Sequence, residues 1–193
     1  MTEERTAEAP TRRYDPERKQ RIIEACLDVI AERGVAGTSH RVVAAAAGVP
    51  LGSMTYHFDG MGDLLHQAFD QFARTSAAHF AKRMRAAGSV EEAREAIAAH
   101  VEEDLLATQR DFNITLELYT LAARDPAYRD ITELWMTASR AELKRFFDPE
   151  TSRMLDALIE GLTLHRAFGG DVATDGARGV REAIRRISDA RPR

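Results

Sequence analysis

The spacing of the apolar residues constrains the fold of this chain more than any other feature. Apolar side chains recur every three or four positions through almost the whole sequence, which places them along one side of a helix. A half-buried strand needs alternating apolar and polar residues, and that alternation extends nowhere beyond a few positions. The pattern predicts an all-α protein of about nine helices, with glycine and proline between the periodic stretches.

Three short helices are predicted before residue 60. The first should span 16–34, because Asp15 can cap it and proline is tolerated in a first turn. A second helix should follow a cap at Thr38 or Ser39, and a third should span 50–58. The single cysteine belongs to the apolar stripe of the first helix, which indicates a buried thiol rather than a nucleophile or metal ligand. That stripe contains Ile22, Ile23, Cys26, Leu27 and Ile30.

Caps and breakers divide the rest of the chain into longer helices. A long helix should span 63–88, and a capping box of Ser89 and Glu92 should start the fifth. The Asp-Pro pairs at 125–126 and 148–149 each place a capping acid before a first-turn proline, so two further helices should start there. The sixth, eighth and ninth helices should span 112–123, 149–168 and 174–189.

The stretch 38–65 predicts a helix-turn-helix, because it holds two short helices joined by a tight turn at Gly48. In the second of these helices Leu51, Met54 and Phe58 are three and four positions apart, so we expect them to dock on the first. The opposite face should meet DNA, and Gly52 removes a side chain that would hold the backbone away. Simple packing of a helical domain is the alternative. The residues expected on the exposed face are Ser53, Thr55, Tyr56 and His57.

This stretch is similar to the DNA-binding motif of one family of regulators. The resemblance covers about a quarter of the chain closely, and the order of the remaining helices also fits. The family that the motif resembles is the TetR family, on the pattern of Thr38, Arg41, Ala47-Gly48-Val49, Gly52 and Tyr56-His57-Phe58, followed by Asp63-Leu64-Leu65.

The resemblance implies a role for each matching residue. Thr38 and Tyr56 are expected to contact phosphates, and His57 to support the end of the second helix of the motif. The residues expected near base edges are Arg41, Ser53 and Thr55. The chain departs from the family pattern at Leu51 and Met61, where lysine is frequent, so Arg12, Arg13, Arg18 or Lys19 would have to supply phosphate contacts instead.

The formal net charge of the chain, −4, is a point against this interpretation. Between residues 12 and 41, however, seven lysines and arginines outnumber five acids. DNA affinity depends on phosphate contacts within a Debye length of about 10 Å, so a small basic face suffices. We therefore expect double-stranded operator DNA as a partner.

Composition and motifs limit the other classes of function. No apolar run approaches the roughly 20 residues that span a bilayer, and the polar first residues do not form a signal peptide, so a cytoplasmic location is expected. No nucleophile elbow, phosphate loop or zinc-type spacing occurs, and the six histidines are scattered. We expect no enzyme activity, no cofactor and no metal. The expected organisation is a disordered arm at 1–14, the DNA-binding domain at 15–60, and a ligand-binding and dimerisation domain at 61–193.

A homodimer is expected, since a helix-turn-helix of this type binds a palindrome in pairs. The last two helices should form the interface as a four-helix bundle, and Gly161 would permit close approach. Packing within one chain is the alternative for the same residues. The predicted interface contains Leu155, Leu158, Ile159, Leu162, Val180, Ile184 and Ile187.

The sixth helix is apolar nearly all round, which predicts that other helices surround it. A mostly apolar ligand would fit a pocket beside it, although core packing is the alternative for each aromatic residue. Glu117 and His165 are the polar candidates for that pocket, with a solvated or salt-bridged position as the alternative. The other predicted pocket residues are Phe112, Leu116, Tyr119, Leu134, Trp135 and Ala138.

The predicted function is a regulator, with repression the expected sign and activation the alternative. Binding of a small molecule should favour a state whose DNA-contacting helices no longer match the operator, with the long fourth helix transmitting the change. The other hypothesis is a DNA-independent helical dimer that binds a ligand or a partner, which the net charge and Met61 favour.

Overall fold

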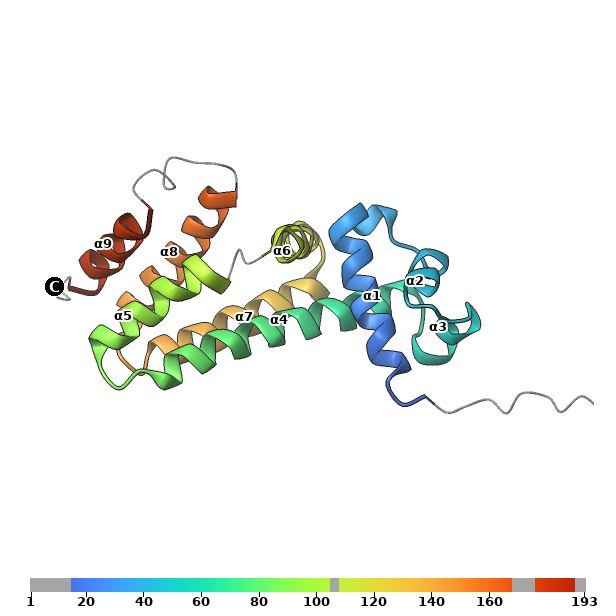
Figure 1. The fold of residues 1–193 in the computed structure, drawn as a ribbon, viewed down its shortest axis with the longest axis horizontal. Helices are drawn as coiled ribbons and strands as arrows, with labels where there is room; N and C mark the ends of the chain where they lie inside the picture. Colours follow the sequence, from blue (N-terminus) through green and yellow to red (C-terminus); the bar gives the residue numbers. More distant parts are fainter. Residues whose placement is uncertain (1–14, 105–107, 168–175, 190–193) are drawn as a thin grey trace, which may run out of the picture.

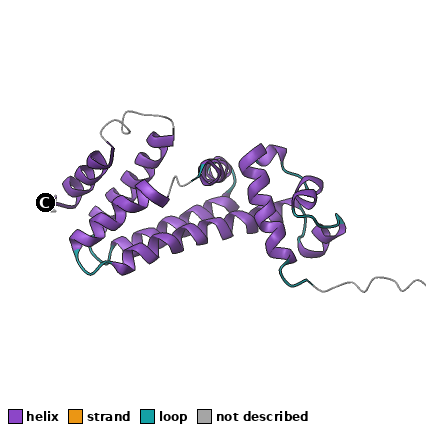
Figure 2. Cartoon of the chain, in the orientation of Figure 1, coloured by secondary structure: helices purple, strands orange, loops and turns teal. Residues whose placement is uncertain are grey.

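The computed structural model describes residues 15–104, 108–167 and 176–189 of the chain. Within these ranges the secondary structure is helical without any strand, which confirms the all-α prediction (Figure 2). None of the helices described is both long and apolar enough to cross a membrane. The α-helices are α1 (Arg18–Arg33), α2 (His40–Ala46), α3 (Gly52–His57), α4 (Met61–Ala86), α5 (Val90–Ala99), α6 (Gln109–Ala122), α7 (Pro126–Leu143), α8 (Pro149–Ala167) and α9 (Gly176–Asp189).

The helices begin where the capping residues predict. The Ser39 hydroxyl accepts the Val42 N–H at 3.4 Å, and the Ser89 hydroxyl accepts the Glu92 N–H at 3.2 Å. Asp125 likewise accepts the Ala127 N–H at 3.0 Å at the start of α7. These side chains satisfy backbone donors that have no partner within their own helix.

Several helix starts differ from the prediction. Helices α3, α4 and α6 begin at Gly52, Met61 and Gln109 rather than at residues 50, 63 and 112, and the start predicted for the ninth helix at 174 lies outside the described residues. The first helix begins at Arg18 rather than Pro16, because the Asp15 carboxylate accepts the Glu17 N–H at 3.1 Å in a turn before the helix. It ends as predicted at Gly34, whose φ of 68° is in the left-handed region that favours glycine.

The helices form an elongated molecule (Figure 1). The long helices α4 and α7 lie side by side and pack against each other. Helices α1, α2 and α3 lie at one end, and α5, α8 and α9 at the other. Helix α6 lies between the two ends and packs against both α1 and α7.

Two hydrophobic cores fill the ends of the molecule. The first combines α1, α2 and α3 with the start of α4 and with parts of α6 and α7, including Ile114 and Ile131. The second combines the end of α4 with α5, α8 and α9. Because the first core includes residues from α6 and α7, the two halves of the chain share packed surface where they meet.

The single cysteine is an inert part of the first core. Cys26 is fully buried, and burial raises the pKa of its thiol to about 12. The thiol is therefore protonated at neutral pH, in agreement with the structural role predicted for it.

Helix α6 is less enclosed than its composition predicts. Phe112, Ile114 and Leu118 are buried, but Leu116 and Tyr119 are only half-buried and Thr120 is exposed. Helices α1 and α7 pack against α6, and the Tyr119 hydroxyl bonds to Glu160 of α8. The prediction that other helices surround α6 therefore holds for its buried side, while Thr120 faces solvent.

Candidate DNA-binding surface and effector cavity

Helices α2 and α3 form the predicted helix-turn-helix. The turn between them includes Gly48, whose φ of 63° again requires the left-handed region. Met54 and Phe58 dock α3 on the first core, as predicted. Leu51 does not: its side chain is 55% exposed, so its predicted place on the docking face is wrong. Its backbone is already helical, but it lies just before the first residue of α3 and its side chain stays in solvent.

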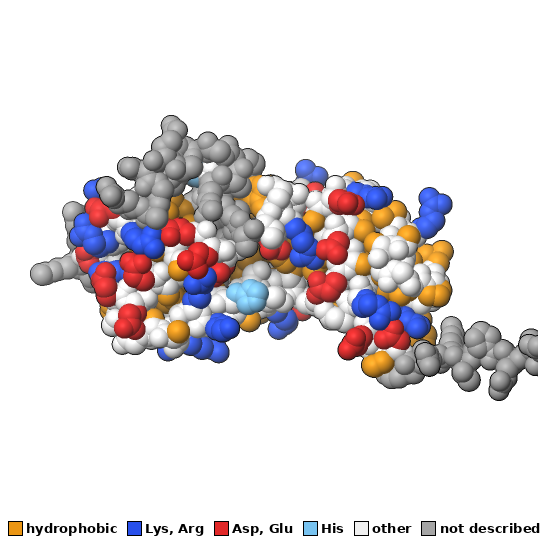
Figure 3. Space-filling view, viewed as in Figure 1, with side chains coloured by type: hydrophobic (Ala, Val, Ile, Leu, Met, Phe, Trp, Pro, Cys, Tyr) orange, Lys and Arg blue, Asp and Glu red, His pale blue; other side chains and the backbone are white. Residues whose placement is uncertain are grey.

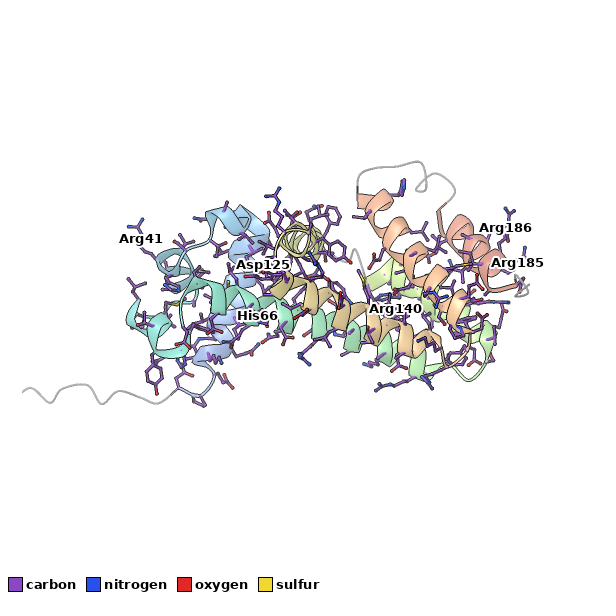
Figure 4. The ribbon with its side chains drawn as sticks, turned by 180° about the vertical axis from the view of Figure 1, so that it is seen from behind. Arg41, His66, Asp125, Arg140, Arg185 and Arg186 are labelled. Carbon is purple, nitrogen blue, oxygen red and sulfur yellow. The ribbon has the colours of Figure 1, made fainter. Side chains whose placement is uncertain are left out.

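The exposed surface of this motif is small and polar. Tyr56 is 76% exposed, and Thr55 is also exposed. A Cβ atom added at Gly52 would meet nothing within 4 Å, so no contact within the described residues requires glycine there. Arg41 is exposed on α2 and projects away from the body of the protein (Figure 4). Arg41 and Tyr56 therefore present side-chain donors to a molecule that approaches from outside.

Ser53 is a correction to the predicted surface. Its side chain is only 8% exposed, because it lies one position before Met54 on the inward half of α3. A helix of six residues is too short for apolar spacing alone to fix which side each residue faces.

Two predicted phosphate or base contacts already have partners within the chain. The Thr38 hydroxyl donates to the Gly34 carbonyl at 2.8 Å, and the Thr55 hydroxyl donates to the Gly52 carbonyl at 3.3 Å. Each hydroxyl must rotate to donate to DNA. His57 is half-buried, and burial, with Arg18 and Lys19 nearby, lowers the pKa of its imidazole. His57 is therefore neutral at pH 7.

Met61, at the start of α4, packs against the first core. This contact is a structural role for an apolar side chain where the family pattern often has lysine. Basic and acidic side chains are interspersed on the face shown in Figure 3. This face therefore presents no broad basic field to DNA, and local contacts at the helix-turn-helix are the candidates for affinity.

A cavity of about 60 Å³ lies between α4, α6, α7 and α8. The structure places Phe112, Tyr119 and Trp135 on its wall, but Leu116 is not among the lining residues. The other lining residues are Phe80, His100, Thr115, Met136, Ser139, Asp156, Ile159, Glu160 and Leu164.

Three residues predicted for this cavity lie outside it. Leu134 is 59% exposed, and Ala138 and His165 are also exposed. On α7 the inward side is set by Trp135 and Ser139, which are four positions apart, so residues 134 and 138 point outward. His165 follows the lining residue Leu164 and faces solvent.

Two carboxylates that line this cavity are not among the predicted pocket residues. Asp156 and Glu160 lie one turn apart on α8, among apolar residues of the same stripe. Two acids at a spacing of four within an apolar stripe were the available signal, because burying a carboxylate is unfavourable unless something binds it.

Each carboxylate has one neighbour from another helix. Asp156 forms an ion pair with Arg140 of α7 at 3.2 Å, and Glu160 accepts a hydrogen bond from the Tyr119 hydroxyl of α6 at 3.0 Å. Burial raises the pKa of Asp156 to about 6, although Arg140 lowers it, and Glu160 raises it further. Burial also lowers the pKa of His100, whose ring is tilted against that of Phe80 with 4.6 Å between the ring centroids. The cavity therefore combines aromatic walls with negative charge.

Helix α6 contacts α1 through three polar side chains. The Glu117 carboxylate accepts the Val35 N–H at 3.1 Å, just after α1 ends. Asn113 donates to the Ala31 carbonyl at 2.9 Å, and Arg110 pairs with Asp28 at 2.6 Å. Glu117 therefore faces the DNA-binding end rather than the cavity. The same helix thus lines the cavity and contacts α1.

Comparison with known proteins identifies the family. Residues 22–68 match the family model described as bacterial regulatory proteins, tetR family. Residues 88–190, more than half of the chain, match the tetracyclin repressor-like C-terminal domain. This protein belongs to the TetR family. TetR-family proteins are DNA-binding transcription factors rather than enzymes, and the C-terminal domain of this regulator is its ligand-binding part.

Individual relatives of this TetR-family protein support the same family assignment. SCO7518 of Streptomyces coelicolor A3(2) is 52% identical, with a TM-score of 0.82 over 91% of this chain and 100% of that one. The multidrug binding protein EbrR, in complex with imidazole, is 34% identical, with a TM-score of 0.75 over 92% of this chain and 98% of that one. The HTH-type transcriptional regulator CymR of Pseudomonas putida is 32% identical over 130 residues, which are 63% of this chain and 61% of CymR.

The TetR-family chain buries most of its predicted dimer interface within itself. Leu155, Ile159, Val180 and Ile184 belong to the second core, so their side chains are not available to a partner. The apolar stripes of α8 and α9 face each other within one chain, and this arrangement has the same spacing as an interface between two chains. The remaining predicted interface residues, Leu158, Leu162 and Ile187, are partly buried against this core.

A different face of α8 stays open. Met154 is 45% exposed, Ala157 is exposed, and a Cβ atom at Gly161 would meet nothing within 4 Å. These residues are three and four positions apart, so they form one stripe of small and apolar side chains.

Proposed function

We propose that this TetR-family regulator is a repressor that binds a palindromic operator as a homodimer and is released by a small, mostly apolar effector. The observation that supports this most directly is the position of α6. It supplies Phe112, Thr115 and Tyr119 to the cavity and Glu117 to the end of α1. An effector that moves α6 therefore acts on the DNA-binding end through direct contacts.

The proposed DNA contacts come from the exposed part of the helix-turn-helix. Arg41 is the candidate for base edges or phosphates, and the exposed Tyr56 hydroxyl for a phosphate. Gly52 allows close approach of the backbone. Thr38 and Thr55 can contribute after their hydroxyls rotate, and neutral His57 supports the helix end. Ser53 is not among the proposed contacts, because it is buried.

The proposed dimer uses the open stripe on α8 rather than the buried residues of α8 and α9. Met154, Ala157 and Gly161 allow close approach of a second α8 around a two-fold axis. Such a dimer serves DNA binding only if it holds the two helix-turn-helix motifs about 34 Å apart, which is one turn of DNA.

The proposed mechanism starts from the size of the cavity. At about 60 Å³ it is smaller than the roughly 300 Å³ of a typical ligand pocket, so an effector must displace a wall. Helix α6 is the wall that also contacts α1, at the DNA-binding end. Displacement of α6 would disturb the contacts of Glu117 and Asn113 with the end of α1. The long helix α4 is a second path by which the effector signal could reach the DNA-binding end. A coupling of about 1–3 kcal/mol would change operator affinity about five- to 150-fold.

The relative EbrR forms complexes with proflavin and ethidium, at 37% and 35% identity to this chain. These complexes support the proposal that this fold, in this chain too, accommodates aromatic molecules larger than the cavity described here.

The test is an anisotropy titration of the purified protein against its own upstream intergenic DNA, at two salt concentrations and with unrelated DNA as a control. We expect selective, salt-sensitive binding by the native protein and its loss in the double variant Arg41→Ala/Tyr56→Ala. Selective binding that survives in the double variant would contradict the proposed contacts. Absence of selectivity at both salt concentrations would favour the alternative, a DNA-independent helical dimer.

A further inference from the structure

The cavity has an unusual combination of wall chemistry. Phe80, Phe112, Tyr119 and Trp135 supply four aromatic rings. Within a turn of one another on α8, Asp156 and Glu160 supply two carboxylates. A pocket built for a neutral apolar molecule has no use for two carboxylates, because burying each charge is costly unless a partner binds it.

The charges that face the cavity do not cancel. Arg140 compensates Asp156 through the ion pair between α7 and α8. Glu160 accepts only a hydrogen bond from the uncharged Tyr119 hydroxyl, and no lysine or arginine pairs with it in the part of the chain that the structure describes. His100 adds no positive charge at neutral pH, because burial lowers its pKa. About one negative charge remains beside the aromatic walls.

We propose that the effector is a flat aromatic cation whose charge is bound by Glu160 and whose ring system lies against the aromatic walls. Aromatic faces attract cations through their quadrupole, and a desolvated carboxylate attracts them through its charge. An anionic effector is disfavoured by both carboxylates. This inference rests on the proposed function, since it names the chemical class of the same effector.

Binding of the cation also explains how α6 is displaced. The hydrogen bond between Tyr119 and Glu160 is a direct polar link between α6 and α8. A cation that takes Glu160 as its partner competes with this link and enters beside Tyr119. Two residues earlier on α6, Glu117 holds the Val35 N–H. Recognition of the charge and movement of α6 against α1 are therefore one event.

The experiment compares two tricyclic molecules of the same shape and different charge. The permanent cation 10-methylacridinium and neutral acridine are titrated at pH 8 into the full-length, DNA-free protein. Calorimetry measures the affinity, and quenching of Trp135 reports binding at the cavity, because it is the only tryptophan in the chain. The variants are Glu160→Gln, which keeps an acceptor for Tyr119, and Glu133→Gln, an exposed acid on α7, as a matched control.

We expect methylacridinium to bind the native protein at least about tenfold more tightly than acridine. Glu160→Gln should remove most of that preference, and Glu133→Gln should keep it. Circular dichroism checks that each variant is folded. If Glu160→Gln does not fold, Asp156→Asn provides a second variant, which should weaken binding of the cation. Equal affinities for the two molecules, or an unchanged preference in Glu160→Gln, would overturn the inference.

Operator binding separates this inference from the proposed function. Both molecules are added to the complex of protein and upstream DNA, with DNA alone as a control. If acridine releases the DNA as well as methylacridinium does, the proposed function as a regulator is supported and the proposal of a cationic effector is wrong. If neither molecule binds the protein, the cationic class fails as well. If both bind at Trp135 and neither changes DNA affinity, the proposed coupling of the cavity to the operator fails.

Discussion

Replacement of Glu117 by alanine tests the contact between α6 and α1. In the native protein this carboxylate accepts the Val35 N–H at 3.1 Å in a partly buried position. A hydrogen bond to a charged group contributes about 1.5–3 kcal/mol, and partial exposure places this one near the lower figure. Glu117→Ala should therefore lower the free energy of unfolding by about 1.5 kcal/mol, which corresponds to about 3–6 °C in Tm for a chain of this size.

Two variants on the same helix make this measurement specific. Glu117→Gln keeps a neutral acceptor and should cost about half as much as alanine. Thr120→Ala removes an exposed hydroxyl that bonds only to the Leu116 carbonyl of its own helix, so it should change stability by less than about 0.5 kcal/mol. Thermal and denaturant unfolding measure the differences, and hydrogen exchange at Val35 reports the lost bond.

Glu117→Ala should also change the response of the regulator to its effector. If α6 transmits the effector signal to α1, the variant should reduce the ratio of operator affinities measured without and with effector. A variant as stable as the native protein would refute the energetic argument. A destabilised variant with undiminished effector response would show that the signal travels by another route, such as α4.

Three further predictions concern the other surfaces. Gly52→Ala should change the free energy of unfolding by less than about 1 kcal/mol, because the added Cβ atom meets no atom within 4 Å. It should weaken operator binding in the anisotropy titration. An unchanged operator affinity would exclude a close approach of DNA to the backbone at Gly52. Asp156 has a pKa of about 6, so it ionises as pH rises from 5 to 8, and the affinity for methylacridinium should rise over this range. Asp156→Asn should flatten that calorimetric profile, and a profile that stays steep would assign the titration to another group. Gly161→Glu on the open stripe of α8 should shift the protein to monomers in analytical ultracentrifugation, and an intact dimer would place the interface elsewhere.

The sequence predicted the helices well because their signals are local. A cap such as Ser89 bonds to a residue three positions away, and the apolar spacing of a long helix repeats often enough to fix its inward side. The same spacing failed on the shortest helix, where Leu51 and Ser53 were assigned to the wrong sides. Six residues complete fewer than two turns, so an error of one position is not corrected by the next.

The cavity and the interface were harder to predict for a different reason. Apolar spacing says that Leu155 and Ile184 are buried, but not whether their own chain or a partner buries them. The contact between Glu117 and Val35 joins residues 82 positions apart, and no local pattern encodes it. The spacing of Asp156 and Glu160 places them on one side of α8, but only the packing of α6, α7 and α8 shows that this side lines a cavity.

The small cavity and the intact contacts of α6 with α1 belong to one conformation. An effector shifts the balance between conformations only by the difference in its affinity for them. A ligand too large for about 60 Å³ binds this conformation poorly, so the wider state gains nearly all of its binding energy. In the wider conformation Glu160 binds a cation in place of the Tyr119 hydroxyl. The bond between Glu160 and the cation is stronger, and this difference offsets the loss of the contacts between α6 and α1. Affinity for the effector and release of the operator therefore depend on the same carboxylate. Glu160→Gln should weaken effector binding, and it should reduce effector-induced release of the operator in proportion.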